Sequence, residues 1–289
     1  MPKNKFQDVV FTAIMATIMG YGMVVYNVAL NTGGVTGQTF LMAVHELPIM
    51  VPVAFVLEFF VVGKIAKAHK IIFHTDAVQA LGNVPIDVKD MGIDLMSMSS
   101  HKIYGPKGEG ALFMRKGLRI SNYIHGGAQE NSKRAGTENL TGIVGFGKAA
   151  ELARINFDKH VQHCSELRNY LVDRILKEIP DTQLNGTMEG RHPGNANITF
   201  KFIEGESILL LLNQFGISVS TGSACSSKSL EPSHVLVALG VPVEMIHGTV
   251  RFTVGDFTTK EDIDYVIEKL KIIVEKLRAL SPINAEKGW

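Results

Sequence analysis

The feature that most constrains this chain is an abrupt change in its chemistry near residue 65. Residues 1–62 carry only five charged side chains, and none lies between Asp8 and Glu46. The rest of the chain mixes charged residues with short apolar runs and polar turns. We therefore expect two unlike parts, and 289 residues leave room for both.

The first part holds two long apolar runs, Val9–Leu30 and Phe40–Val62, joined by the Gly-rich stretch Asn31–Gln38. A helix of the first run is about 33 Å long at 1.5 Å per residue, and a bilayer core is about 30 Å thick. Lysines flank the pair at both ends, so the positive-inside rule places both ends in the cytoplasm. We expect an α-helical transmembrane hairpin over residues 1–68, its spans within 9–62, anchored at the inner face of the cell membrane. A buried helical hairpin in a soluble core is the alternative.

The stretches FTAIMATIMGYGMVVYN and MAVHELPIMVPVAFVLEFFVVGKIAK carry a family resemblance. On them, residues 1–68 are similar to a small family of two-span bacterial membrane proteins of unknown function, the DUF2798-like hairpins. This resemblance implies no chemistry.

From about Lys70 onward the pattern is that of an α/β protein, with apolar runs typical of strands alternating with helical periodicity. Thr258 or Thr259 with Asp262 is expected to cap the last helix. The expected strands are 70–77, 93–100, 110–117, 197–203, 217–222 and 249–255, and the expected helices are 138–179 (one or two), 207–215, 233–239 and 260–280.

Charge and cysteine content exclude several classes of protein. The formal net charge is +1, which argues against a broad nucleic-acid surface. The two cysteines, Cys164 and Cys225, cannot form a disulfide framework or a four-thiolate metal site, and no metal is expected. A reducing compartment is the simpler interpretation.

Three clusters of polar residues are candidates for chemistry. HTDAVQ (74–79) and SSHK (99–102) each follow an expected strand, at the edge where α/β sheets bind ligands. A carboxylate for a pyridinium nitrogen and a lysine for a Schiff base are what pyridoxal phosphate (PLP) needs from a protein. The third cluster, TGSACSS (221–227), surrounds one thiol with small residues. Each also has a structural explanation: Asp76 as a helix cap, Lys102 as a surface charge, Cys225 as a small core residue.

The order of the motifs points further. The stretches HTDAVQALGNVPIDV, DLMSMSSHKIYGPKGEGALF, HGGAQENSKRAGTENLTGIVGFGKA, STGSACSSKSLEPSHVLVALG and VRFTVGDFTTKEDID run in sequence over residues 70–289. In them the chain resembles the C-terminal half of NifS/IscS-type cysteine desulfurases, of the class V aminotransferase family. The implied fold is part of a fold type I PLP-dependent transferase large domain, residues 69–181. An α+β small domain with the cysteine loop, residues 182–289, is expected to follow.

The resemblance implies that Lys102 holds PLP as a Schiff base. It places Asp76 on the pyridine nitrogen and Gln79 near the ring hydroxyl. Ser99 and His101 match ligands of the phosphate.

Three further roles follow from the same resemblance. Thr137 matches a threonine that reaches the phosphate of the other subunit's cofactor, which implies a homodimer. Arg251 matches the arginine that clamps the substrate carboxylate. Cys225 matches the nucleophile that takes sulfur from L-cysteine as a persulfide and releases L-alanine, while Cys164 matches nothing and is expected to be structural.

The implied function is that of a cytoplasmic cysteine desulfurase. Its sulfur would pass to acceptor proteins for iron–sulfur cluster assembly or tRNA thiolation. The family's N-terminal half supplies the ring-stacking histidine and a phosphate loop, and residues 1–69 contain neither. We therefore expect impaired activity and exposed apolar strand faces. The alternative is a non-catalytic remnant that acts as a membrane hairpin or an interaction module.

Overall fold

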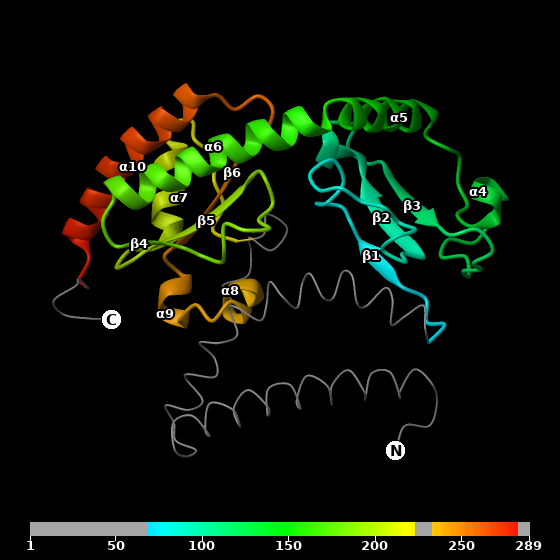
Figure 1. The fold of residues 1–289 in the computed structure, drawn as a ribbon, viewed down its shortest axis with the longest axis horizontal. Coiled ribbons are helices and arrows are strands. Elements are labelled where there is room, and N and C mark those ends of the chain that lie inside the picture. Colours follow the sequence, from blue (N-terminus) through cyan, green and yellow to red (C-terminus); the bar gives the residue numbers. More distant parts are fainter. Residues whose placement is uncertain (1–68, 223–232, 283–289) are drawn as a thin grey trace, which may run out of the picture.

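The computed structural model describes residues 69–222 and 233–282, which form two separate three-stranded sheets with flanking helices (Figure 1). The predicted membrane hairpin and Cys225 lie outside these residues. Among the described residues, no helix combines the length and the apolar character needed to cross a bilayer.

The first sheet has the order β1-β2-β3: β1 (His74–Asp76), β2 (Leu95–Ser99) and β3 (Gly110–Met114). β1 and β2 are parallel, and β3 is antiparallel to β2. The expected strands are confirmed, although β1 is shorter than the expected range 70–77 and its residues His74 and Asp76 are exposed. β1 is the edge strand of this sheet, so no further described strand covers its outer side.

A short 3₁₀ helix, η2 (Ser100–Ile103), follows β2 directly. It packs against α5 (Leu140–Ile155), which is preceded by the single turn α4 (Gln129–Ser132). α5 leaves large apolar side chains in solvent, with Leu140 71% and Val144 64% exposed. This exposed apolar surface lies on a helix, so the expected exposure of apolar strand faces stays a prediction.

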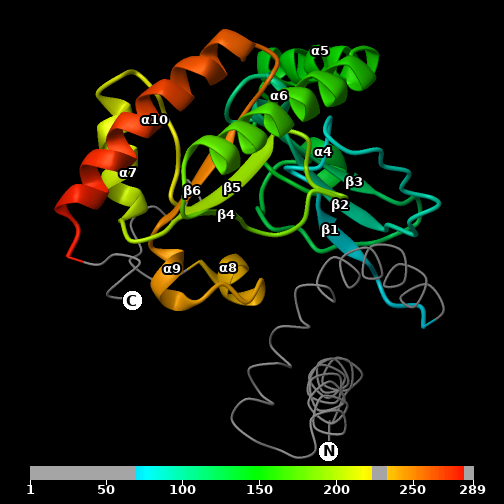
Figure 2. The same ribbon diagram turned by 60° about the vertical axis from the view of Figure 1, so that its left-hand side comes forward.

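The second sheet is antiparallel in the order β4-β5-β6: β4 (Thr182–Leu184), β5 (Asn195–Phe200) and β6 (Thr249–Thr253). Helices α6 and α10 lie on one side of it and the short helices α8 and α9 on the other, as the two views agree (Figures 1 and 2). α7 packs on α10 and β6. The bounds are α6 (Phe157–Glu178), α7 (Gly205–Asn213), α8 (His234–Ala238), α9 (Val243–Ile246) and α10 (Lys260–Leu280).

The main hydrophobic core lies between this sheet and its helices. Leu171, Ile198, Phe200, Ile208 and Ile267 are each at most 1% exposed. Leu171 stands on α6, so that helix is part of the core of the second sheet although it precedes residue 182 in the chain. The predicted division of the chain at residues 181 and 182 stays a prediction.

Most expected elements of the second half are confirmed. α10 spans residues 260–280 as expected, and Thr259 and Asp262 form a reciprocal capping box at its start. The helical region 138–179 is two helices that meet at Asn156. The expected strand 217–222 is wrong: only Ser220 pairs there, as a single bridge to Arg251. β4, α4 and α9 were not expected.

Shortening Ile267 to alanine is expected to lower the free energy of unfolding by about 2–5 kcal/mol, because its side chain is fully buried on α10 against the second sheet. Ile272→Ala on the same helix is the matched control, since Ile272 is 54% exposed. Its effect should stay below about 1 kcal/mol. Urea unfolding followed by circular dichroism measures both, and equal losses would contradict this core.

Candidate functional site

The predicted cofactor residues lie at the carboxyl ends of β1 and β2. The strands are parallel, and Asp76, the last residue of β1, is in register with Ser97 of β2. Ser99 ends β2, and η2 then carries His101 and Lys102. Since parallel strands end at the same edge of a sheet, the two predicted clusters come together there.

The side chains at this edge are held by local hydrogen bonds. Asp76 Oδ1 accepts the backbone N–H of Val78 at 2.9 Å, which fixes the carboxylate over the turn after β1. Ser99 Oγ and His101 Nδ1 are 2.8 Å apart. Asp76, His101 and Lys102 are all exposed, so a carboxylate, a hydroxyl–imidazole pair and an amine are open to a ligand.

Two other predicted residues are placed elsewhere in the fold. Thr137 is exposed in the loop before α5. Arg251 lies on β6 of the second sheet, and its Nε atom is buried without a hydrogen-bond partner among the described residues. The structure therefore places four predicted cofactor residues at one sheet edge, while Thr137 and Arg251 stand on other segments of the chain.

Gln79 follows β1 and has an exposed side chain. Its backbone carbonyl accepts a hydrogen bond from His192 Nε2 at 3.1 Å, which links the first half to the loop before β5. The structure thus places Gln79 next to the Asp76 edge of the sheet. It gives the Gln79 side chain no contact that defines a role.

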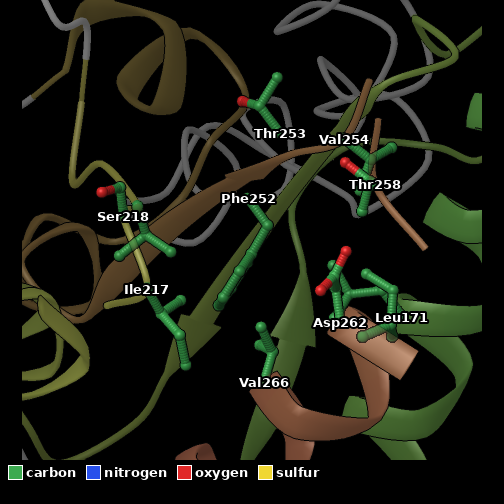
Figure 3. A pocket seen from close by; sticks show the side chains of 11 residues that line it. Leu171, Ile217, Ser218, Phe252, Thr253, Val254, Thr258, Asp262 and Val266 are labelled. Atoms are coloured by element: carbon green, nitrogen blue, oxygen red, sulfur yellow. The ribbon is translucent and has the colours of Figure 1, made fainter. Parts of the chain in front are cut away.

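A hollow lies between residues 217–219, β6 and α10, as Figure 3 shows. Ile217, Phe252 and Val266 give it an apolar lining, and Asp262 lies at one side. None of the predicted cofactor residues lines this hollow. It is therefore no candidate for the PLP site.

A polar junction joins the part of the chain that forms the first sheet to the part that forms the second sheet. The sequence did not predict it. His160 Nε2 and Asn83 Oδ1 are 3.0 Å apart, and the backbone N–H of Asp256 donates to the Tyr104 hydroxyl at 2.9 Å. The partners are separated by 77 and 152 positions in the chain. No local pattern signals contacts at such distances.

His192, at this junction, is expected to make the free energy of unfolding depend on pH. Its Nδ1 accepts the N–H of Gly194 while Nε2 bonds to the carbonyl of Gln79, a pattern that needs the neutral ring. Burial, and then the charges of His160 and Arg168, lower the pKa of His192.

Because the folded-state pKa lies below the unfolded value, the contribution of His192 is present above about pH 6.5 and is lost as the pH falls through the lower value. We expect the free energy of unfolding to decline on acidification by at most about 1.4 kcal/mol per pH unit from this group. Urea unfolding at several pH values should show a smaller decline for His192→Gln. An unchanged profile in that variant would contradict the assignment.

Comparison with known proteins places the chain in a family. The family model described as aminotransferase class-V matches residues 56–266, which is more than half of the chain. The chain belongs to the aminotransferase class-V family. A second model, a domain of unknown function (DUF2798), matches residues 4–73.

The class-V chain is similar to several curated cysteine desulfurases. It is 56% identical over 224 residues to the cysteine desulfurase IscS of Dictyoglomus turgidum, covering 78% of this chain and 57% of that protein. It is 55% identical over 226 residues to that of Methanosarcina thermophila, covering 78% and 56%. The chain therefore spans a little over half the length of the curated relatives it matches.

Solved structures share the fold of this class-V chain. The NifS-like protein from Rickettsia africae superposes with a TM-score of 0.69 at 32% identity, covering 75% of this chain and 57% of that one. Another NifS-like protein gives 0.66 at 33% identity. The two described sheets thus correspond to part of the class-V fold.

PLP is the cofactor that the family resemblance implies, and the residues at the edge of the first sheet fit it. The cofactor presents an aldehyde, a pyridine nitrogen and a phosphate. The exposed Lys102 amine, the Asp76 carboxylate and the Ser99–His101 pair supply a matching chemical group for each. The donor set therefore fits PLP.

Proposed function

We propose that this chain carries out cysteine desulfurase chemistry, in which sulfur moves from L-cysteine to Cys225 and L-alanine is released. The observation that carries the proposal is the meeting of Asp76, Ser99, His101 and Lys102 at one sheet edge. The 56% identity to a cysteine desulfurase supports the choice among class-V activities.

Each residue of this edge has a distinct task. Lys102 would hold the cofactor covalently through its amine. Asp76, held by the Val78 N–H, would keep a negative charge at the pyridine nitrogen. Ser99 and His101 would hold the phosphate, and Gln79 would lie near the ring hydroxyl. PLP itself supplies the electron sink for the reaction.

Arg251 and Cys225 act on the substrate. A guanidinium group suits a carboxylate because it donates two parallel hydrogen bonds, and the buried, unpartnered Nε of Arg251 within the described residues is consistent with an unfilled role. The Cys225 thiolate attacks the substrate sulfur. A sulfur–sulfur bond forms as the carbon–sulfur bond of cysteine breaks, which leaves a persulfide on Cys225 and alanine as the product.

We also propose the setting in which this chemistry takes place. The persulfide sulfur passes to acceptor proteins for iron–sulfur cluster assembly or tRNA thiolation, in the cytoplasm. The exposed apolar side chains of α5 and the exposed Thr137 before it support a homodimer in which Thr137 serves the other subunit's site. The apolar runs within residues 9–62, whose only charged residues are Glu46 and Glu58, support attachment to the membrane.

A non-catalytic interaction module is the second candidate. It is favoured by one observation: Arg251 stands on β6 of the second sheet, whereas Lys102 stands on η2 beside the first sheet. In this case the chain keeps the residues that match the family's motifs, but these residues do not act together in catalysis.

Product analysis separates the two candidates. The full chain is incubated with PLP, L-cysteine and dithiothreitol, which releases persulfide sulfur as sulfide. A desulfurase forms alanine and sulfide in equal amounts, exceeding the amount of protein. Neither product would appear above a protein-free control containing PLP if the chain is an interaction module.

A further inference from the structure

Three side chains of metal-binding type meet at the junction, apart from the proposed PLP residues. His160 and Cys164 stand on α6, and Asp256 lies in the loop after β6. One ligand atom from each lies within 4.8 Å of the others. None of the three has a task in the desulfurase chemistry proposed above.

The spacing of the three is set by the fold. His160 and Cys164 are four residues apart, so they lie on the same face of α6 one turn apart. Cys164 Sγ is 3.8 Å from His160 Nδ1, and Asp256 Oδ1 is 2.5 Å from the same nitrogen. In a tetrahedral zinc site, bonds of about 2.0–2.3 Å place ligand atoms about 3.3–3.6 Å apart. The exposed Asp256 carboxylate must move about 1 Å away from His160 Nδ1 to reach that spacing. The third pair, Cys164 Sγ and the Asp256 carboxylate, lies within 4.8 Å and must settle at the same spacing when the ion binds.

Asn83 fixes the orientation of the histidine. Its Nδ2 donates to the carbonyls of Gln79 and Leu81, each at 3.3 Å, so its Oδ1 is turned toward His160 Nε2 at 3.0 Å. Nε2 must then carry a proton, and Nδ1 is the ring nitrogen that faces Asp256. Cys164 Sγ lies beside the ring, 3.8 Å from Nδ1 and 3.9 Å from Nε2. A metal-binding histidine usually donates its second N–H to an oxygen in this way.

We propose that His160, Cys164 and Asp256 bind a divalent transition-metal ion of the zinc class, with water as a fourth ligand. A thiolate and an imidazole favour Zn²⁺ and similar ions over Mg²⁺ or Ca²⁺, which prefer oxygen ligands throughout. In the metal-free protein a proton joins Nδ1 and Oδ1, and the ion replaces that proton.

Binding also removes the proton of the thiol. Burial, and then the charge of Asp256, raise the pKa of Cys164 to about 11, so the free group is a thiol. A metal ion deprotonates the thiol that it binds, and both protons are released to solvent. The ion joins α6 to the loop after β6, and through Asn83 it also steadies the turn after β1. It would therefore hold the two halves of the chain together.

Cobalt reports directly on this site, because a thiolate bound to Co²⁺ gives a near-ultraviolet charge-transfer band. The full chain, without a polyhistidine tag or PLP, is titrated with Co²⁺ and then with Zn²⁺. We expect one Co²⁺ per chain, a thiolate band, and displacement of the Co²⁺ by Zn²⁺. Cys225→Ser should keep the band and Cys164→Ala should lose it.

Cys164 is buried, so Cys164→Ala could fail to fold. Asp256→Asn is then the second test, because Asp256 is exposed and its replacement should leave the fold intact. This change is expected to weaken Co²⁺ binding at least tenfold, while the exposed control Asp90→Asn binds as the unmodified chain does. The proposal is overturned if a folded chain gives no thiolate band. It is also overturned if the band depends on Cys225, or if Asp256→Asn and Asp90→Asn bind Co²⁺ equally.

Discussion

Lys102→Ala is expected to abolish both the visible absorption of bound PLP and the formation of alanine, the latter by at least about 10³-fold. The reason is that Lys102 is the amine at the edge where Asp76 and the Ser99–His101 pair are gathered. Absorption spectra of the chain with added PLP measure the first effect, and alanine assays measure the second.

Lys107→Ala is the matched control, because Lys107 is exposed in the turn that follows η2 and has no proposed role. It should retain the absorption band and the rate. If both variants lost the absorption band and the rate equally, PLP would be binding to lysines of this segment non-specifically. A band that survives in Lys102→Ala would contradict the placement of the cofactor.

Cys225→Ser is expected to abolish alanine and sulfide formation, again by at least about 10³-fold, and to leave the PLP absorption band intact. A serine hydroxyl is a poor nucleophile toward sulfur. The second thiol cannot replace Cys225, because Cys164 is fully buried and its pKa is raised to about 11 by burial and by Asp256.

Mass spectrometry locates the sulfur that is transferred. After one turnover without reductant, the peptide with Cys225 should gain one sulfur atom, and the peptide with Cys164 none. A persulfide on Cys164, or an unchanged rate in Cys225→Ser, would refute the assignment of the nucleophile.

Local signals predicted a large part of the fold. The bounds of α10 follow from apolar periodicity and from the Thr259–Asp262 capping box, both readable within a few residues. The sequence does not decide whether residues 138–179 form one helix or two, because helical periodicity continues across Asn156, where α5 and α6 meet. Residues 217–222 have a strand-like composition, yet only Ser220 pairs with another segment, as a single bridge to Arg251. A strand forms only where a neighbouring segment offers backbone groups for hydrogen bonds along its length.

The proposed cofactor edge was predictable because it depends on local sequence and on one strand pairing. Asp76, Ser99, His101 and Lys102 follow two strands directly, and a parallel pairing suffices to bring the strand ends together. The His160–Cys164–Asp256 site was not predictable, since Asp256 lies 96 positions from His160 in the chain. Cys164 was expected to be structural, an expectation that its burial fits and that the metal proposal extends.

The expectation of impaired activity stays a prediction. Steady-state alanine formation by the full chain, set against that of the Dictyoglomus turgidum IscS protein assayed alongside, measures it. We expect a rate lower by at least about 10²-fold, because catalytic groups that act as a unit give little rate enhancement when some of them are missing from the site. Equal rates would show that the Lys102 edge works as a complete site.

The most direct test of the central claim is to fix the cofactor where it binds. Borohydride reduction of the chain with PLP converts a lysine–PLP linkage into a stable one, and peptide mass mapping then identifies the lysine. The account predicts one pyridoxyl phosphate group per chain, on the peptide that contains Lys102. Label spread over several lysines, or none on Lys102, would contradict it.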